Sequence, residues 1–229
     1  MKKTIPAREL IIKTLTEKSV MKLHIYKQTK ELMKVFKECL KEINEDMKEK
    51  VNTGEINLYF NYHEKSDYEV SISFAGDTLI FHMHSNVFAF EKSHYMYNTP
   101  YIKKDEDRAY CAVINVYNFL TDSIKYNREN DIGYLIARIF INKEQHFFVE
   151  GKRQLGFLYN EFGTRVIDKE AIKAIIESAV LYAIDFDLLM PNYDKVNQVS
   201  IGEIYSHSEM LQQKTGKRMG FMFQADSLD

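Results

Sequence analysis

Two histidines two residues apart, His82 and His84, come nearest in this sequence to a catalytic or metal-binding motif. They fall in a segment of alternating polarity, and side chains two apart on a strand point to the same face. Both imidazoles could then bind one metal ion with a third ligand such as His63 or His94, as in a metal-dependent hydrolase or nuclease. The residues that alternate with them are apolar, so a simpler explanation is a polar outer sheet face.

An acidic pair, Asp185 and Asp187, ends an apolar helical segment. Residues two apart on a helix do not share a face, and carboxylates at this end oppose the helix dipole. A bound cation would resolve that conflict, and so would a helix that ends near Ile184. The chain has no phosphate-binding glycine motif, and Cys39 and Cys111 lie in apolar segments without a neighbouring histidine. The sequence therefore assigns no catalytic residue, no metal ligand and no cofactor.

A basic stripe follows one face of the predicted N-terminal helix. It consists of Lys27, Lys30, Lys34, Lys37, Lys41 and Lys48. Such a stripe could contact nucleic-acid phosphates. Several of these lysines have a glutamate four residues later, as in the pairs Lys27/Glu31, Lys34/Glu38 and Lys41/Glu45. This spacing is typical of a solvated helix with ion pairs along its surface, which makes nucleic-acid binding the less favoured alternative.

The polar face of the predicted sheet, with the loop beside it, is the strongest candidate for function. Its candidate binding residues are Asn57, Tyr59, Asn61, His63, His82, His84, Tyr95 and Tyr97. Tyrosine gives a large contact area at a small loss of side-chain entropy, which suits protein recognition. An antiparallel sheet can also simply expose one face to water. We therefore expect a non-enzymatic protein-binding or assembly protein that acts through this face, the long helix, or both. One alternative is a metal-dependent hydrolase or nuclease that uses His82 and His84 with an acidic residue such as Asp185 or Asp187. The other is nucleic-acid binding through the lysine stripe of the N-terminal helix.

The long helix is the first element that must position these residues. Residues 7–50 contain no Gly or Pro and are rich in helix formers. From residue 20 onward the apolar residues recur at three-to-four spacing. They are Met21, Ile25, Leu32, Phe36, Leu40, Ile43 and Met47. The stripe of residues 7–18, formed by Leu10, Ile11 and Leu15, is out of phase with it, which predicts a break near Glu17–Ser19. Such a helix could also pair with a second copy of the chain.

After Gly54 the apolar period changes to two, which predicts strands. They are expected at 56–63, 68–74, 78–84, 87–90, 110–120, 132–142, 145–150 and 155–159, with a short extra one at 124–126. Residues 91–108 are expected to form a long loop. Helices are expected at 169–188, with Asp168 as N-cap, and from 200 to about 213, before a final strand at 219–223. The predicted fold is α+β, an antiparallel meander of roughly seven to nine strands with C-terminal helices packed on it.

The 229 residues are 45% hydrophobic and 28% charged, which suits one globular domain. We expect a single α+β domain over 1–229, helical at 1–52, an antiparallel sheet at 55–162, helical at 168–214 and a tail at 215–229. The absence of a signal sequence, of a membrane-length apolar run and of a cysteine framework favours the cytoplasm. The many Lys, Asn, Ile and Tyr residues suggest an AT-rich bacterial or viral genome.

The net charge of −2 is unevenly distributed. Residues 1–52 carry 13 basic and 8 acidic side chains, whereas residues 53–229 carry 18 and 25, which gives +5 and −7. Such asymmetry is typical of a surface that meets a partner. We therefore expect a protein partner or self-association into a homo-oligomer, and neither membrane nor nucleic acid as the target.

Overall fold

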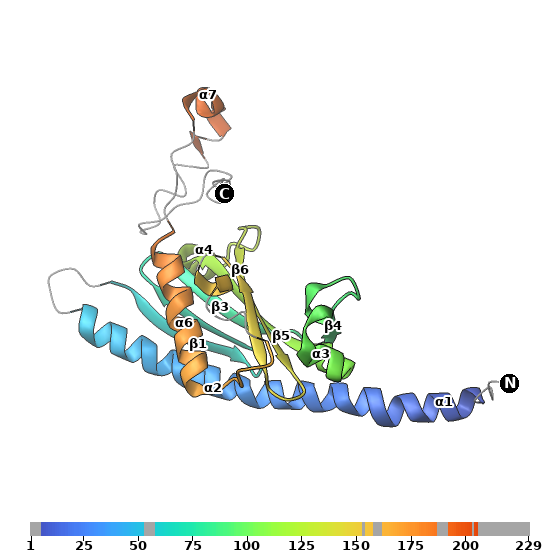
Figure 1. Ribbon diagram of the computed structural model, residues 1–229. Helices are drawn as coiled ribbons and strands as arrows, with labels where there is room; N and C mark the ends of the chain where they lie inside the picture. The colour runs from blue at the N-terminus through green and yellow to red at the C-terminus, as the bar shows by residue number, and fades with distance from the viewer. Residues whose placement is uncertain are drawn as a thin grey trace.

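In the computed structural model, two helices cover one face of a seven-stranded antiparallel sheet (Figure 1). The structure describes residues 6–52, 58–152, 154–157, 162–186, 192–202 and 204–205. This arrangement confirms the predicted α+β class. Asn57, Asp187, most of the last predicted helix, the predicted strand at 219–223 and the tail lie outside the described residues.

The N-terminal helix is continuous where the sequence predicts a break. Helix α1 (Ala7–Thr14) runs through a π-helical turn (Leu15–Ser19) into α2 (Val20–Val51). A π-helical turn holds more residues than an α-helical one, so it changes the direction in which the following side chains point. The out-of-phase apolar stripes are therefore joined by a change of pitch and not by a loop.

Helix α2 is held on the sheet by the apolar stripe that its sequence predicts. Ile25, Phe36 and Leu40 have no exposed surface, and Ile43 is also buried. The Phe36 ring lies 5.9 Å from the ring of Phe81 on the sheet, measured between centroids. Burial of a side chain of this size stabilises the fold by about 1.5–3 kcal/mol, so this stripe fixes the helix across the strands.

Helix α6 (Lys169–Ile184) packs beside α2 on the same face of the sheet. The Asp168 carboxylate accepts a hydrogen bond from the Ala171 amide at 2.7 Å, which confirms the predicted N-cap. The helix ends at Ile184, with Asp185 as its C-cap, so Asp185 lies outside the last turn. The helix thus ends at Ile184, one of the two outcomes that the sequence allows, and the Asp185 amide still donates to the Leu181 carbonyl at 2.9 Å.

The strand order is β1-β2-β3-β5-β6-β7, and every neighbouring pair is antiparallel. Their bounds are β1 Phe60–Ser66, β2 Glu69–Phe74, β3 Asp77–Met83, β5 Tyr110–Leu120, β6 Tyr134–Asn142 and β7 Phe147–Gly151. The short strand β4 (Phe88–Ala89) pairs with the beginning of β5. The strands predicted at 124–126 and 155–159 are wrong: the chain forms the short helices α4 (Thr121–Lys125) and α5 (Gln154–Phe157). Leu155 of α5 is buried in the main core, which a helical turn achieves without an extra strand.

The predicted long loop at 91–108 contains three short helices instead. They are the 3₁₀ turn Tyr95–Asn98, helix α3 (Pro100–Lys104) and the 3₁₀ turn Glu106–Ala109. The side chains of His94, Thr99 and Asp105 cap them by accepting backbone N–H groups. We call residues 88–109 the lobe. The lobe packs on the sheet through a second core, which consists of Met96, Ile102, Ala109, Cys111, Val113, Phe140, Phe148 and Phe162.

Gly163 fits against the lobe because it has no side chain. Its φ of +104° is in the left-handed region, and a Cβ there would stand 2.5 Å from Cγ of Tyr101. We expect Gly163→Ala to lower the free energy of unfolding by about 2 kcal/mol or more, from backbone strain and from displacement of the Tyr101 ring. Urea denaturation measures this loss.

Gly202→Ala is the matched control for that substitution. A Cβ at Gly202 has Ser200 Oγ as its nearest neighbour, at 3.9 Å, and its φ lies outside the left-handed region. We expect its unfolding midpoint to stay near that of the unsubstituted protein. Equal midpoints for the two variants would contradict the packing of Gly163 against Tyr101.

Both cysteines, Cys39 and Cys111, are buried and free. Burial raises the pKa of each thiol, so both sulfurs favour the protonated form. They therefore act as small core residues. Across the described ranges, no helix combines the length and apolar character needed to cross a membrane.

Candidate functional site

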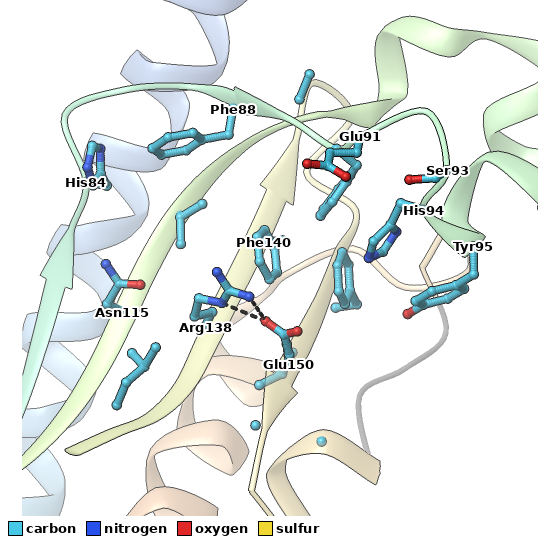
Figure 2. A pocket seen from close by; sticks show the side chains of 18 of the residues that line it. His84, Phe88, Glu91, Ser93, His94, Tyr95, Asn115, Arg138, Phe140 and Glu150 are labelled. Atoms are coloured by element: carbon cyan, nitrogen blue, oxygen red, sulfur yellow. Dashed lines mark hydrogen bonds and ion pairs between the residues drawn. The ribbon is translucent and has the colours of Figure 1, made fainter.

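An open groove of about 850 Å³ lies on the sheet face opposite α2 and α6 (Figure 2). Its floor comes from β5, β6 and β7, and its walls come from the end of β3 and from the lobe. Alternation along the strands produces this face: Val113, Asn115 and Tyr117 point into it, whereas Ile114 and Val116 point into the main core. The groove therefore lies on the same sheet face as the predicted polar residues, but its floor is formed by β5, β6 and β7 and not by the first three strands, where the sequence places most of them.

Aromatic rings form one end of the groove. Phe140 and Phe148 stack on the floor with centroids 4.7 Å apart, and Phe90 of the lobe lies 5.2 Å from Phe140. His84 meets Phe88 edge to face at 4.7 Å, and His94 stacks on Phe90 at 4.6 Å. Phe140 and Phe148 belong to the second core and are buried, whereas Phe88 is 42% exposed and Phe90 is half-buried. The ring surface that a ligand can reach therefore comes mainly from Phe88 and Phe90.

In each of the two histidines that line the groove, one ring nitrogen accepts a backbone hydrogen bond. His84 Nδ1 accepts the Asn86 amide at 3.0 Å, and His94 Nδ1 accepts the Met96 amide at 3.4 Å. A neutral imidazole whose Nδ1 is an acceptor carries its proton on Nε2. Each ring therefore offers one N–H donor beside the aromatic end.

A row of polar residues crosses the sheet next to the aromatic end. Strand register places its members opposite one another on β2, β3, β5, β6 and β7: Glu69, His82, Asn115, Arg138 and Glu150. Arg138 Nε donates to Glu150 Oε2 at 2.6 Å, and the guanidinium lies 5.3 Å from the centre of the Phe140 ring. Both side chains of this ion pair are about half exposed. On the floor of the groove, a charged pair therefore lies directly against an aromatic ring.

Tyr95 stands at the rim of the groove on the lobe side (Figure 2). Burial and, second, the Glu150 carboxylate raise the pKa of its phenol, so the hydroxyl stays protonated at neutral pH. About half of its surface is exposed. Tyr95 therefore offers a broad ring and a polar tip to anything that enters the groove.

The structure separates the predicted binding residues into two groups. His84 and Tyr95 line the groove, and His82 lies on the same sheet face in the polar row. Tyr59, Asn61 and His63 lie on or just before β1, at the far edge of the sheet. The Tyr97 hydroxyl donates to the Phe90 carbonyl at 3.2 Å, so Tyr97 fixes the lobe.

The predicted metal ligands do not come together in the described part of the chain. There, no group of three or more His, Cys, Asp or Glu side chains could hold a metal ion. His63 is on β1, two strands away from His82 on β3. Asp185 ends α6, which covers the opposite face of the sheet.

Three lysines of the predicted stripe pair with carboxylates, although not with the predicted ones. Lys37 is largely buried, and its Nζ lies 2.6 Å from the Glu64 carboxylate on β1. Lys30 pairs with Asp67 at 2.8 Å. Lys34 pairs with Glu31 at 2.6 Å, one turn earlier in the chain, and not with Glu38.

Several residues that line the groove could not be recognised from the sequence as members of one site. Asn115, Arg138, Glu150 and the aromatic pair Phe140 and Phe148 come from three strands. Their signal in the sequence is a polar residue inside an otherwise apolar strand, as at Asn115 and Arg138. That signal does not say which strands are neighbours, so it could not assemble the groove.

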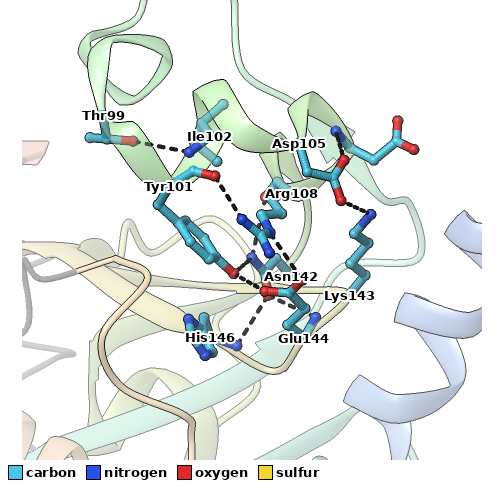
Figure 3. Close-up of polar contacts among 10 residues, drawn as sticks. Thr99, Tyr101, Ile102, Asp105, Arg108, Asn142, Lys143, Glu144 and His146 are labelled. Carbon is cyan, nitrogen blue, oxygen red and sulfur yellow. Dashed lines mark hydrogen bonds and ion pairs between the residues drawn. The ribbon is translucent and has the colours of Figure 1, made fainter.

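A polar network fastens the lobe to the β6–β7 turn (Figure 3). Glu144 accepts hydrogen bonds from the Tyr101 hydroxyl at 2.7 Å and from Arg108 Nε at 2.9 Å. The Arg108 guanidinium also lies over the Tyr101 ring, 4.5 Å from its centre. Beside them, Lys143 Nζ donates to the Asp105 carboxylate at 2.6 Å. These contacts hold the groove wall in place.

The network predicts a loss of stability in acid. A hydrogen bond from Lys143 lowers the pKa of Asp105; for Glu144, burial acts to raise the pKa, but hydrogen bonds from Tyr101 and Arg108 outweigh it and lower it. A carboxyl whose pKa is depressed by folding stabilises the protein above its unfolded pKa and loses that effect as pH falls. We expect the free energy of unfolding to decline below the ordinary values of 3.8 and 4.5.

Urea titrations from neutral pH down to pH 3 measure this slope. Glu144→Gln and Asp105→Asn each remove one titrating group, so each variant should show a shallower decline. The double variant should be flatter still. A double variant with the slope of the unsubstituted protein would show that acid acts elsewhere.

The groove thus has an aromatic end beside a row of polar and charged residues. One of its walls is the lobe, which the network around Glu144 holds on the sheet. Its donors are the histidine N–H groups and the Arg138 guanidinium, and its acceptor is the Glu150 carboxylate. These groups suit reversible binding of a partly apolar ligand. Comparison of the chain with protein families, curated proteins and solved structures gives no match, so the functional proposal rests on this geometry.

Proposed function

We propose that this protein is a non-enzymatic binding protein whose groove receives a segment of a partner protein. The observation that carries the proposal is the direct contact between the aromatic end and the Arg138–Glu150 pair. A matching segment has an aromatic or aliphatic side chain for the ring surface. Next to that side chain, the segment has a polar or charged side chain that contacts Arg138 and Glu150 in the polar row.

The composition of the groove supports a protein ligand. Tyrosine, phenylalanine and arginine are enriched in the centres of protein interfaces, and Tyr and Arg dominate their binding energy. The groove volume of about 850 Å³ is also large enough for two or three side chains of a partner. Because Arg138 and Glu150 are half exposed, their pairing contributes at most about 1 kcal/mol, and a partner can exchange it for its own contacts.

We place this function in the cytoplasm. The support is the state of the cysteines, since both Cys39 and Cys111 are free thiols. Proteins of oxidising compartments more often pair their cysteines in disulfides.

A displayed library of random peptides tests the proposal with a defined probe. We expect selection on the whole protein to enrich peptides with an aromatic or aliphatic residue beside a charged one. Fluorescence polarisation of one such peptide should show that Tyr95→Ala and Arg138→Ala each weaken binding about tenfold or more, as for residues at an interface centre. Both side chains are about half exposed, so we expect the fold to be retained in both variants.

Tyr193→Ala supplies the control, because Tyr193 is 77% exposed and lies in α7 (Tyr193–Val196), away from the groove. Its affinity for the selected peptide should equal that of the unsubstituted protein. The proposal is wrong if no peptide is enriched. It is also wrong if the enriched peptides bind the groove variants and the control equally well.

A further inference from the structure

The N-terminal end of the long helix exposes a set of aliphatic side chains. We call residues 7–17 the arm; α1 extends past the lobe in Figure 1, and none of its residues is buried. Leu10, Ile11, Ile12 and Leu15 are each more than half exposed. Four such side chains within two turns form an apolar surface of the kind that marks an interaction site.

The arm's own body does not cover this surface. Contact with the body begins after the arm, where Lys18 and Lys22 lie 5.2 and 5.1 Å from the centre of the Tyr110 ring. Every residue of the arm is exposed, so its aliphatic side chains take no part in the stripe that α2 buries on the sheet. The arm therefore presents its aliphatic side chains outward.

A matching apolar groove lies at the other end of the same helix. It runs between α2 and α6, has a volume of about 700 Å³, and we call it the helix groove. Ile43, Met47 and Val180 form its floor, and Leu181 and Ile184, each more than half exposed, form its side. An amphipathic helix laid into such a groove is a common mode of recognition.

The arm of one copy cannot reach its own helix groove. Ile12 and Asp46 are 34 residues apart on one continuous helix, which at 1.5 Å per residue separates them by about 50 Å. The arm and the helix groove of one molecule are thus held apart by a rigid spacer. Only another molecule can bring the two surfaces together.

The N-terminal segment around the arm is basic and the helix groove is weakly acidic, although the arm itself carries two basic and two acidic side chains. Residues 1–20 carry five basic and two acidic side chains. The helix groove carries three acidic residues, Glu42, Asp46 and Glu177, against two lysines. Glu42 and Asp46 take part in exposed ion pairs with Lys169 and Lys50, which contribute little and can be exchanged.

We propose that two copies of this chain form a dimer in which the arm of each lies in the helix groove of the other. An antiparallel partner satisfies both contacts at once, because the same helix separates arm and groove in each copy. Specific interfaces bury about 1,200–2,000 Å², more than one short arm supplies, and the reciprocal exchange doubles the buried area. This self-association is independent of the groove on the opposite face of the sheet.

Sedimentation analysis and light scattering on the full chain test the proposal, from micromolar to hundreds of micromolar. We expect a species of twice the 27.0 kDa chain mass. An arm variant, Ile11→Asp with Leu15→Asp, and a helix-groove variant, Leu181→Asp, should each raise the dimer dissociation constant about 100-fold or more by placing a charge in the contact. Ile132→Asp, at a position 69% exposed outside both surfaces, should leave it unchanged.

Mixing the arm variant with the helix-groove variant distinguishes the modes of pairing. One variant retains an intact groove and the other an intact arm, so the mixture should regain a heterodimer through one of the two contacts. Circular dichroism of each variant confirms that its helices are formed. A monomer at all concentrations overturns the proposal. So does a dimer that the arm variant abolishes and the helix-groove variant leaves intact, because that result means arm pairs with arm.

Discussion

Replacement of Phe36 by alanine is expected to lower the free energy of unfolding by about 3–5 kcal/mol. Phe36 has no exposed surface and packs on Phe81, between α2 and the sheet. Alanine removes the ring and leaves a cavity that its buried neighbours Met33 and Leu40 fill only in part. A loss of this size is a large fraction of the stability of an average domain. Urea or guanidinium unfolding measures it directly.

Val51→Ala is the matched control on the same helix. Val51 is 45% exposed at the last turn of α2, so we expect a change within about 0.5 kcal/mol. The contrast would show that tertiary packing and not helix propensity holds α2. Similar small losses for both variants would mean that the Phe36 cavity collapses, or that α2 contributes little to the fold.

Replacement of Asn142 by alanine is the second large effect that we expect. The Asn142 side chain is fully buried and makes four hydrogen bonds. Nδ2 donates to the Tyr101 hydroxyl at 2.8 Å and to the Arg108 carbonyl at 3.3 Å. Oδ1 accepts the Glu144 amide at 3.0 Å and the His146 amide at 3.1 Å. Each buried group left unsatisfied costs about 1–3 kcal/mol, so we expect a total loss of about 2–4 kcal/mol, measured by urea denaturation.

The loss at Asn142 should be concentrated in the lobe. Both Tyr101 and Arg108 belong to the lobe, so trypsin should cut faster at the exposed Lys103 and Lys104 in Asn142→Ala. Asn61→Ala, at an exposed position on β1, is the control and should keep the original stability and cleavage pattern. An unchanged cleavage rate at the two lysines in Asn142→Ala would show that the lobe does not depend on this side chain.

Much of the architecture follows from the sequence because the relevant signals are local. The apolar stripe around Phe36 predicts the buried face of α2, and the mainly apolar segment at 110–120 predicts β5 with its observed bounds. Asp168 is recognised as an N-cap from its type and position alone. Helix and strand periods are set by the backbone itself, so a single segment carries enough information to predict them.

The lobe shows where local signals fail. Residues 91–108 alternate polar and apolar types too irregularly to predict a helix, and their short helices depend on caps and on a second core from distant strands. The wrong strand at 155–159 has the same cause. The apolar character of Leu155 is compatible with a strand or a helix. Its burial in the main core accompanies a helical turn at Gln154–Phe157.

The sequence by itself determined the two long helices α2 and α6, most strands, the α+β class and the polar character of one sheet face. Only the tertiary structure decided which polar residues meet. His84 and Tyr95 join Arg138 and Glu150 in the groove, while His63 stays at the far edge. The physical reason is that strand order and register are set by contacts between residues far apart in the chain, and a slip of one residue would send every side chain to the other face.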